Sequence, residues 1–189
     1  MEAGLTGKGR LRSVGRVLFV LLMLLPMEPR SALAVSSEYK IKAALIYKLT
    51  RFVEWPQDNL QQKDFGICIL GRDDFGSALD ALESRKVDGL PIRIRRLVQS
   101  EAVDAGCQIL FVSESKRPFL RSILGSLQGR PILTIGDVEQ FAEQGGMIEF
   151  IRGRKRIGFR INLQQATQAG LKIAAPLLEL STIVETEAS

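Results

Sequence analysis

The chain has 189 residues, with 26 Lys and Arg, 21 Asp and Glu, no His, and a formal net charge of +5. Its length suits a single domain with a sizeable core. The absence of histidine excludes Ser-His-Asp and Cys-His catalysis, histidine-based zinc sites and the commonest general base.

Residues 1–34 have the layout of a secretory signal peptide. Basic residues up to Arg16 precede an apolar core at 17–26, and the small-residue site Ala32-Leu33-Ala34 follows. The core has about ten residues, whereas a transmembrane helix needs about twenty. No cysteine follows Ala34, which argues against a lipid anchor. We therefore expect cleavage after Ala34 and a mature chain, 35–189, outside the cytoplasm.

The leader also accounts for much of the positive charge. It holds five of the basic and two of the acidic residues, so its removal lowers the net charge from +5 to +2. The basic excess is therefore no argument for nucleic-acid binding, and we expect no nucleic-acid partner. No repeat or low-complexity stretch divides the mature chain, which predicts one domain.

Apolar spacing predicts a helix from Ser36 that ends at Trp55-Pro56, because proline disfavours a helical residue before it. Its inward stripe is expected to consist of Ile41, Leu45, Leu49 and Phe52, widened by Ala44 and Tyr47. Trp55 is the only tryptophan, and we interpret it as an aromatic plug where the helix meets a sheet. A ligand or partner contact is the alternative for this side chain.

The apolar run in residues 65–70 predicts a strand that is buried on both faces, as in a parallel sheet. A helix to about Ser84 is expected next, capped by Asp73 or Asp74. These two carboxylates also resemble the acidic pair of a magnesium-dependent receiver domain. Such a domain needs a further aspartate where this chain has Ser113, so capping is the favoured interpretation.

Residues 91–97 alternate apolar side chains with arginines behind a leading proline, after a turn at Val87-Asp88-Gly89. This pattern predicts an edge strand whose charges discourage edge-to-edge pairing. A binding patch is the alternative interpretation of the arginines.

Two more strand-helix units follow. Residues 107–113 predict a buried strand and 116–127 a helix. Residues 131–136 predict the next strand, and 138–144 a short helix capped by Asp137.

The C-terminal part predicts a hairpin from residues 147–152 and 156–162, with a basic tip. We interpret the tip as a solvated turn, with an acidic partner or anionic headgroups as the alternative. Residues 163–180 predict a last helix, capped by Asn162 and kinked at Pro176. Its broad apolar face is expected to close the core, to dock on another protein, or both.

Together these elements predict a single α/β domain with a central, mainly parallel sheet, a C-terminal β-hairpin and flanking helices. The carboxyl ends of the strands form the natural ligand crevice of such a sheet, here near Arg72, Ser113 and Asp137. Their spacing specifies no ligand, and the sequence predicts no catalytic residue, metal site or cofactor.

The two cysteines, Cys68 and Cys107, lie on strands that we expect to be adjacent. An exported protein matures in an oxidising compartment, where disulfides form and persist. We therefore predict a disulfide between them, with two buried thiols as the alternative.

An ordered set of segments carries a family resemblance. They are Ile46-Tyr-Lys-Leu-Thr-Arg-Phe-Val-Glu-Trp-Pro56, Ile67-Cys-Ile-Leu-Gly71, Cys107-Gln-Ile-Leu-Phe-Val-Ser113, Leu133-Thr-Ile-Gly-Asp137, Gly145-Gly-Met-Ile-Glu-Phe150, and Ile161-Asn-Leu continuing to Ala169-Gly-Leu171. In this order, and behind a signal peptide, they resemble the YfiR/HmsC-like periplasmic proteins over about residues 38–185.

The resemblance implies a periplasmic, non-enzymatic regulator that binds and represses the sensing domain of an inner-membrane diguanylate cyclase. Cyclic di-GMP and biofilm formation would fall as a result. It also implies a homodimer. Some members have a further cysteine pair around the hairpin, but this chain has none between Met147 and Asn162. A periplasmic small-molecule-binding sensor is the alternative function.

Overall fold

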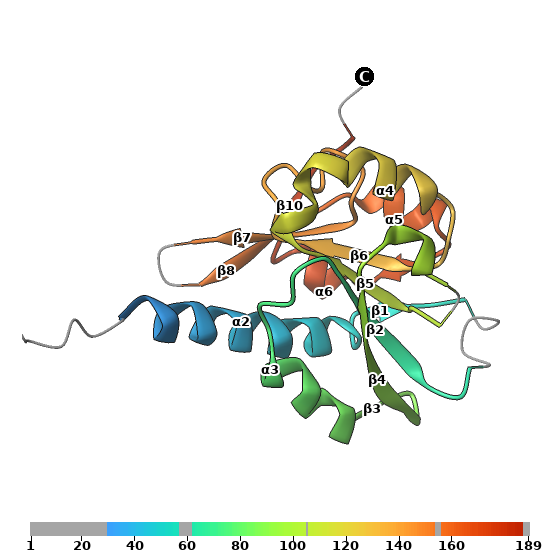
Figure 1. Cartoon of the computed structure of the whole chain (residues 1–189). Coiled ribbons are helices and arrows are strands. Elements are labelled where there is room, and N and C mark those ends of the chain that lie inside the picture. Colours follow the sequence, from blue (N-terminus) through green and yellow to red (C-terminus); the bar gives the residue numbers. More distant parts are fainter. Residues whose placement is uncertain (1–29, 57–61, 105, 154–155, 187–189) are drawn as a thin grey trace, which may run out of the picture. The chain divides into compact units, whose positions relative to one another are not determined.

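The computed structural model describes residues 30–56, 62–104, 106–153 and 156–186 (Figure 1). Its main strands are β2 (Phe65–Leu70), β3 (Lys86–Val87), β4 (Leu90–Leu97), β5 (Ile109–Val112), β6 (Leu133–Gly136), β7 (Ile148–Arg152), β8 (Ile157–Ile161) and β10 (Thr182–Ile183). They form one sheet in the order β10-β8-β7-β6-β5-β2-β4-β3. The neighbours from β4 through β7 are parallel, and β8 returns antiparallel to β7. The expected α/β domain with a mainly parallel sheet and a C-terminal hairpin is confirmed.

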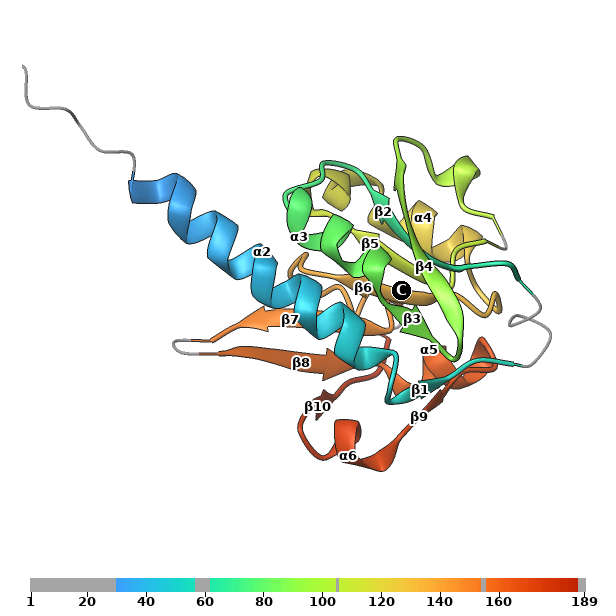
Figure 2. The ribbon, with the colours of Figure 1, turned by 90° about the horizontal axis from the view of Figure 1, so that it is seen from below.

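Helices cover both faces of this sheet. They are α2 (Arg30–Leu49), α3 (Ser77–Asp80), α4 (Leu120–Ser126), α5 (Leu163–Gln168) and α6 (Ala175–Leu178), with the 3₁₀ turns η2 (Ala81–Ser84), η3 (Ser100–Ala102) and η4 (Glu114–Phe119). From Val35 on, α2 lies with α3 on one face, and α4 lies on the other (Figures 1 and 2). Ile67 and Ile69 of β2 pack on the α2 side, while Cys68 and Leu70 pack on the α4 side. This alternation is the two-residue period of a strand, and it explains why β2 is apolar throughout.

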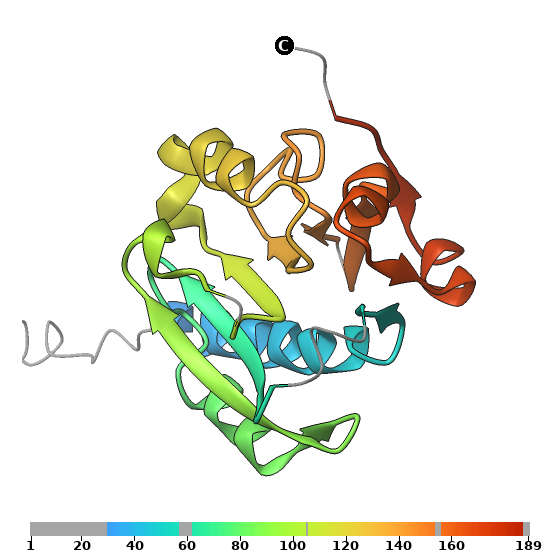
Figure 3. The same cartoon turned by 90° about the vertical axis from the view of Figure 1, so that its right-hand side faces the viewer.

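A second, two-stranded pair joins β1 (Val53–Glu54) to β9 (Lys172–Ile173). The segment after β8 (red in Figure 3) lies at the opposite edge of the main sheet from β3 and β4 (green). Trp55 follows β1 and is buried, with its indole N–H 3.1 Å from the carbonyl of Gln108 and its ring edge-on to Phe65. The aromatic plug is therefore confirmed.

Most of the predicted leader lies outside the described residues. Only residues 30–34 are described, and there α2 has already begun. Cleavage after Ala34 falls within this helix and stays a prediction. No helix in the described ranges is long and apolar enough to cross a membrane.

The buried stripe of α2 differs from the predicted one. The buried apolar residues of the helix are Ala43, Ile46 and Leu49. The charged residue Lys42 is buried as well, whereas Ile41 is 53% exposed. Ala44 is exposed as well. The predicted inward positions Ile41 and Ala44 were wrong because the helix turns the ammonium of Lys42 toward the carboxylate of Asp137 at the end of β6.

Most of β4 lies at an edge of the main sheet, as expected for this segment. β3 pairs only with the first residues of β4. Beyond them, the Ile94 amide donates to the Glu83 carboxylate at 3.1 Å. Each arginine also has acidic partners: Arg93 pairs with Glu83, Arg95 with Asp64 and Asp104, and Arg96 with Asp73 and Asp80.

The segments after β2, β5 and β6 are less helical than predicted. α3 begins only at Ser77, and its N-cap is Gly76 without a side-chain cap, so capping by Asp73 or Asp74 was wrong. Asp73 instead accepts from the amides of Phe75 and Gly76 in a tight turn. In the segment 116–127, where one helix was predicted, the residues up to Phe119 belong to the 3₁₀ turn η4. The α-helix α4 begins only at Leu120.

Residues 138–144 form successive turns instead of the predicted helix, and Asp137 caps nothing there. The reason is Phe141, whose ring fills the space that a Cβ would need at Gly136 and Gly146. The chain must turn tightly, with Gln140 at a φ of 61°, to bring this ring under the sheet.

The predicted single helix at 163–180 is also wrong, because it is divided into α5, β9 and α6. Asn162 caps α5 as expected, accepting from the Gln165 amide at 3.1 Å. Gly170, at a φ of 76°, then ends the helix, with its own amide bonded to Thr167 and that of Leu171 bonded to Ala166. These two bonds form a Schellman motif. Pro176 lies in the first turn of α6 and starts a new helix where a kink was expected.

Cys68 and Cys107 lie together as a disulfide, with a Cα–Cα distance of 5.7 Å. Cys68 is in β2, and Cys107 lies two residues before the start of the neighbouring strand β5. The distance lies within the range that a disulfide requires.

Candidate functional site

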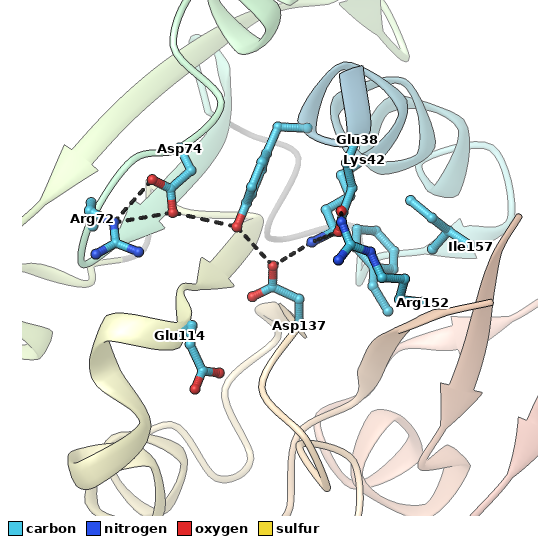
Figure 4. A pocket seen from close by; sticks show the side chains of 10 residues that line it. Glu38, Lys42, Arg72, Asp74, Glu114, Asp137, Arg152 and Ile157 are labelled. Carbon is cyan, nitrogen blue, oxygen red and sulfur yellow. Dashed lines mark hydrogen bonds and ion pairs between the residues drawn. The ribbon is translucent and has the colours of Figure 1, made fainter. Parts of the chain in front are cut away.

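A cleft of about 440 Å³ opens at the carboxyl ends of the parallel strands (Figure 4). Its lining comprises Glu38, Tyr39, Lys42, Arg72, Asp74, Glu114, Asp137, Phe150, Arg152 and Ile157. Strands β2 and β5 are neighbours in the sheet, with β4 beyond β2 and β6 beyond β5. The chain therefore continues from β2 toward one edge of the sheet and from β5 toward the other. Such a switch point is where open α/β sheets bind ligands.

Asp137 is at the floor of this cleft, directly after β6. Its Oδ2 lies 2.5 Å from Lys42 Nζ and 3.1 Å from the hydroxyl of Tyr39. The side chains of Lys42 and Asp137 are only 6% and 9% exposed. The second carboxylate oxygen, Oδ1, is buried and has no hydrogen-bond partner among the described residues.

Helix α2 supplies the other side of this cluster through three neighbouring residues. Lys42 Nζ lies 2.8 Å from Glu38 Oε1, one helical turn earlier, and 4.4 Å from the centroid of the Tyr39 ring. Glu38 also pairs with Arg152 of β7. The buried lysine is therefore compensated by two carboxylates and an aromatic face.

The titration of Tyr39 and Glu38 reflects these surroundings. Burial, together with the negative charges of Asp137 and Asp74, raises the pKa of the Tyr39 hydroxyl well above its ordinary value. Burial acts to raise the pKa of Glu38 too, but Lys42 and Arg152 outweigh it and hold that pKa below its ordinary value. Tyr39 is thus a permanent hydrogen-bond donor, and Glu38 a permanent carboxylate, near neutral pH.

The mouth of the cleft is more exposed and also paired. Arg72 Nε lies 3.0 Å from Asp74 Oδ1, and the side chain of Arg72 is 68% exposed. Glu114 pairs with Arg117 at 2.6 Å, outside the lining. Every charged side chain of the lining therefore has an oppositely charged partner, although Asp137 Oδ1 accepts no hydrogen bond within the described part of the chain.

Two of the three residues expected at the crevice, Arg72 and Asp137, do line it. Ser113 does not, because its hydroxyl faces that of Ser115 at 2.7 Å, and the next residue, Glu114, lines the cleft instead. The sequence reasoning missed Tyr39 and Lys42. The sequence pattern that could have indicated them is the pair of Glu38 and Lys42, which are one helical turn apart and next to the aromatic residue Tyr39.

A second acidic cluster lies between β7, β8 and the turns before them. Glu149, with a side chain 4% exposed, accepts from Arg160 at 3.0 Å and from the Ala142 amide at 3.2 Å. Glu143 lies 3.7 Å from the same arginine, and its Oε2 is buried without a partner in the described structure. Burial, together with the negative charge of Glu143, raises the pKa of Glu149.

Asp73 and Asp74 do not act as a pair. Asp73 turns to the amides before α3 and to Arg96, whereas Asp74 turns to Arg72 and Tyr39 in the cleft. Within the described ranges, no three His, Cys, Asp or Glu side chains are grouped as a metal site would require.

Comparison with known families matches residues 39–182 to the family described as YfiR/HmsC-like. The matched region contains every lining residue of the cleft except Glu38. A comparison with curated proteins finds no match.

Proposed function

Because the chain belongs to the YfiR/HmsC-like family, we propose that it is a periplasmic repressor of an inner-membrane diguanylate cyclase. The family comprises regulators of diguanylate cyclases that are periplasmic and non-catalytic. The proposal is more specific: the protein binds the periplasmic sensing domain of the cyclase and so lowers cyclic di-GMP and biofilm formation. The observation that carries it is the match over residues 39–182.

Repression by binding has a thermodynamic requirement. A bound protein shifts a cyclase toward its inactive state only if it binds that state more tightly than the active one. The repressor therefore acts stoichiometrically and needs no turnover. The absence of histidine is compatible with this mode of action.

A surface for such a contact lies at the C-terminal edge of the sheet. Leu180 is 75% exposed, and Ile183 of β10, three residues later in the chain, is 48% exposed. β10 is the edge strand and pairs only with β8 among the described strands. An edge strand with exposed apolar side chains is a common place for another chain to bind. This surface replaces the helix face that the sequence suggested.

Deletion of the gene tests the proposal. Cyclic di-GMP should rise in the deletion strain and return to its original level when the cyclase gene is deleted as well. Pull-down from periplasm and membrane should recover the cyclase. An enzyme acting on a periplasmic substrate would not show this dependence on the cyclase.

The alternative, a periplasmic small-molecule sensor, is favoured by the cleft at the switch point of the sheet. It becomes the better interpretation if deletion leaves cyclic di-GMP unchanged and no membrane partner is recovered. Export through a cleaved leader and assembly as a homodimer remain part of the proposal under either function.

A further inference from the structure

Two glutamates share one arginine in the acidic cluster of β7, β8 and the turn 138–145. Glu149 Oε1 lies 3.0 Å and Glu143 Oε1 lies 3.7 Å from the same atom, Arg160 Nη1. The side chains of Glu149 and Glu143 are only 4% and 19% exposed. Glu143 Oε2 accepts no hydrogen bond within the described residues. One cation therefore faces two carboxylates in a poorly solvated place, where ionisation of both is unfavourable.

The titration of Glu149 reflects this shortage of positive charge. Burial, the negative charge of Glu143 and a hydrogen bond to its side chain raise the pKa of Glu149, whereas the Ala142 amide and Arg160 act to lower it. Of the other charged residues around the cluster, Arg121 of α4 lines a groove with Glu143, but its side chain is exposed. Two carboxylates that meet in this way commonly hold one proton between them.

A chain of hydrogen bonds runs from Glu149 to the segment after β10. The Ala142 amide donates to Glu149 Oε2 at 3.2 Å, and the Ala142 carbonyl accepts from Asn162 Nδ2 at 3.0 Å. Asn162 Nδ2 also donates to Thr186 Oγ1 at 2.9 Å. Asn162 is fully buried, so water does not readily replace these bonds. The turn that carries Glu143 is thus tied to the C-terminal segment.

This segment also carries the edge strand of the surface proposed for the cyclase. β10 is two residues long and pairs with β8, where Thr182 lies opposite Arg160. The next bond joins the Val184 amide to the Ile161 carbonyl at 3.0 Å. A short, exposed edge strand opens locally at a low cost in free energy. The order of β10 therefore depends on the anchor at Thr186.

We propose that Glu143 and Glu149 share one proton and act as a pH-sensitive latch on the C-terminal edge of the sheet. While the proton is present, the turn 138–145 stays against β7 and holds Thr186 through Ala142 and Asn162. When the pH rises and the proton leaves to solvent, the two carboxylates repel each other, the turn moves and β10 loosens. Cyclase repression then weakens. This last consequence rests on the proposed function, whereas the latch itself does not.

The latch closes at low pH and opens at high pH. The raised pKa of Glu149 means that the folded protein binds the proton more tightly than a state in which the cluster is opened. The closed state is therefore favoured below the ordinary glutamate pKa of 4.5 and loses this advantage as the pH rises through the raised pKa. Each unit of pKa shift corresponds to about a tenfold change in the equilibrium between closed and open states.

Amide hydrogen exchange of the exported protein, followed by NMR from pH 4.5 upward, tests the latch. Protection factors remove the intrinsic dependence of exchange on pH. We expect protection at Val184 to fall about tenfold as the carboxyl signal of Glu149 titrates. Val184 should also be less protected than Ile69 of the buried strand β2 at every pH, because it exchanges through local opening.

Three variants assign this behaviour to the pair and to the chain of bonds. Glu143→Gln removes one charge but still donates a hydrogen bond, so Val184 should stay protected as the pH rises and Glu149 should titrate at lower pH. Glu139→Gln makes the same change at an exposed position of the same turn and should follow the wild type. Thr186→Val removes the last bond of the chain, so protection at Val184 should be low and independent of pH.

Binding to the periplasmic domain of the cyclase measures the effect on repression. The affinity of the wild type should weaken about tenfold over the same rise in pH. The affinity of Glu143→Gln should not weaken in this way. Titration of groups on the cyclase affects both proteins equally, so the difference between them reports the latch.

The latch is overturned if protection at Val184 stays constant while Glu149 titrates, or if Val184 is as protected as Ile69. It is also overturned if Glu143→Gln follows the wild type. If this variant does not fold, the wild-type comparison of Val184 with the Glu149 signal decides.

Two further outcomes separate the parts of the proposal. A fall in protection that persists in Thr186→Val overturns the connection through Asn162. If the wild type and Glu143→Gln bind the cyclase equally at every pH, control of repression by the latch is overturned while repression stands. If no cyclase binds at any pH, the proposed function fails, but the exchange results on the isolated protein still decide the latch.

Discussion

Lys42 donates to Asp137 across 2.5 Å, although 95 residues separate them and both side chains are nearly buried. The pair joins α2 to the end of β6 at the floor of the cleft. A buried ion pair is costly to desolvate but still more costly to break, because the remaining charge loses its partner. The pair therefore fixes both the rotation of α2 and the position of the cleft.

Replacing Lys42 should be strongly destabilising. We expect Lys42→Met to lower the free energy of unfolding by about 3 kcal/mol, since Asp137 would remain buried without its nearest cation. Urea denaturation measures the change. Lys48→Met, at an exposed position of the same helix, should change it by less than about 0.5 kcal/mol. Equal stability of the two variants would show that the buried pair does not hold α2 in place.

Some parts of the fold could be predicted from the sequence and others could not, and the Lys42–Asp137 pair illustrates the difference. Strands β2, β5 and β6 are predictable because they are buried on both faces and therefore apolar throughout. The buried face of α2 is not, since the burial of Lys42 depends on Asp137, which is distant in sequence. Arg72 and Asp137 could be placed in the cleft because the carboxyl ends of parallel strands share one edge.

The division of the predicted C-terminal helix into α5, β9 and α6 was missed for a different reason. Gly170 and Pro176 were visible, but the apolar spacing from Leu163 to Leu180 is equally typical of one long helix. Its apolar residues are in fact shared among α5, β9 and α6, and β9 needs β1 as its partner. A pairing between residues so far apart in the chain leaves no local signal.

The disulfide between Cys68 and Cys107 should be detectable by intact mass under non-reducing, denaturing conditions. We expect no free thiol to react with an alkylating reagent. The bond closes a loop of 39 residues, so Cys68→Ser should lower the free energy of unfolding by about 4 kcal/mol in the chain-entropy model. Two alkylated cysteines in the exported protein would contradict the pairing.

The mature chain should begin at Val35. This follows from the small-residue site at Ala32-Leu33-Ala34 and from the absence of a cysteine after it. N-terminal sequencing of the periplasmic fraction measures the cleavage point. Recovery of a chain that retains Met1 in the membrane fraction would contradict it.

The cluster around Glu149 should make stability depend on pH. Burial and Glu143 raise the pKa of Glu149 in the folded state, so the folded protein binds this proton more tightly than the unfolded chain. This contribution to stability is greatest below the ordinary pKa of 4.5 and is lost as the pH rises through the raised value. Arg160, the cation that faces Glu149, limits the loss.

Glu143→Gln tests this by removing the neighbouring negative charge. The pKa of Glu149 should fall, and the free energy of unfolding at pH 7 should rise by about 0.5–1 kcal/mol. Denaturation at several pH values should show a smaller loss of stability above pH 4.5. The exposed Glu139→Gln should reproduce the wild-type pH profile. If stability depends on pH in the same way in the wild type, Glu143→Gln and Glu139→Gln, then Glu143 does not contribute to this dependence.

Repression should depend on the exposed apolar residues at the C-terminal edge of the sheet. We expect Leu180→Glu combined with Ile183→Glu to raise cyclic di-GMP toward the level of the deletion strain, because two charges would have to be buried in the contact with the cyclase. Thermal stability should change little, since both side chains are exposed in the free protein. Ile41→Glu, at a similarly exposed position of α2, should leave repression intact. If both variants repress as well as the wild type while pull-down still recovers the cyclase, the contact lies on another surface of the protein.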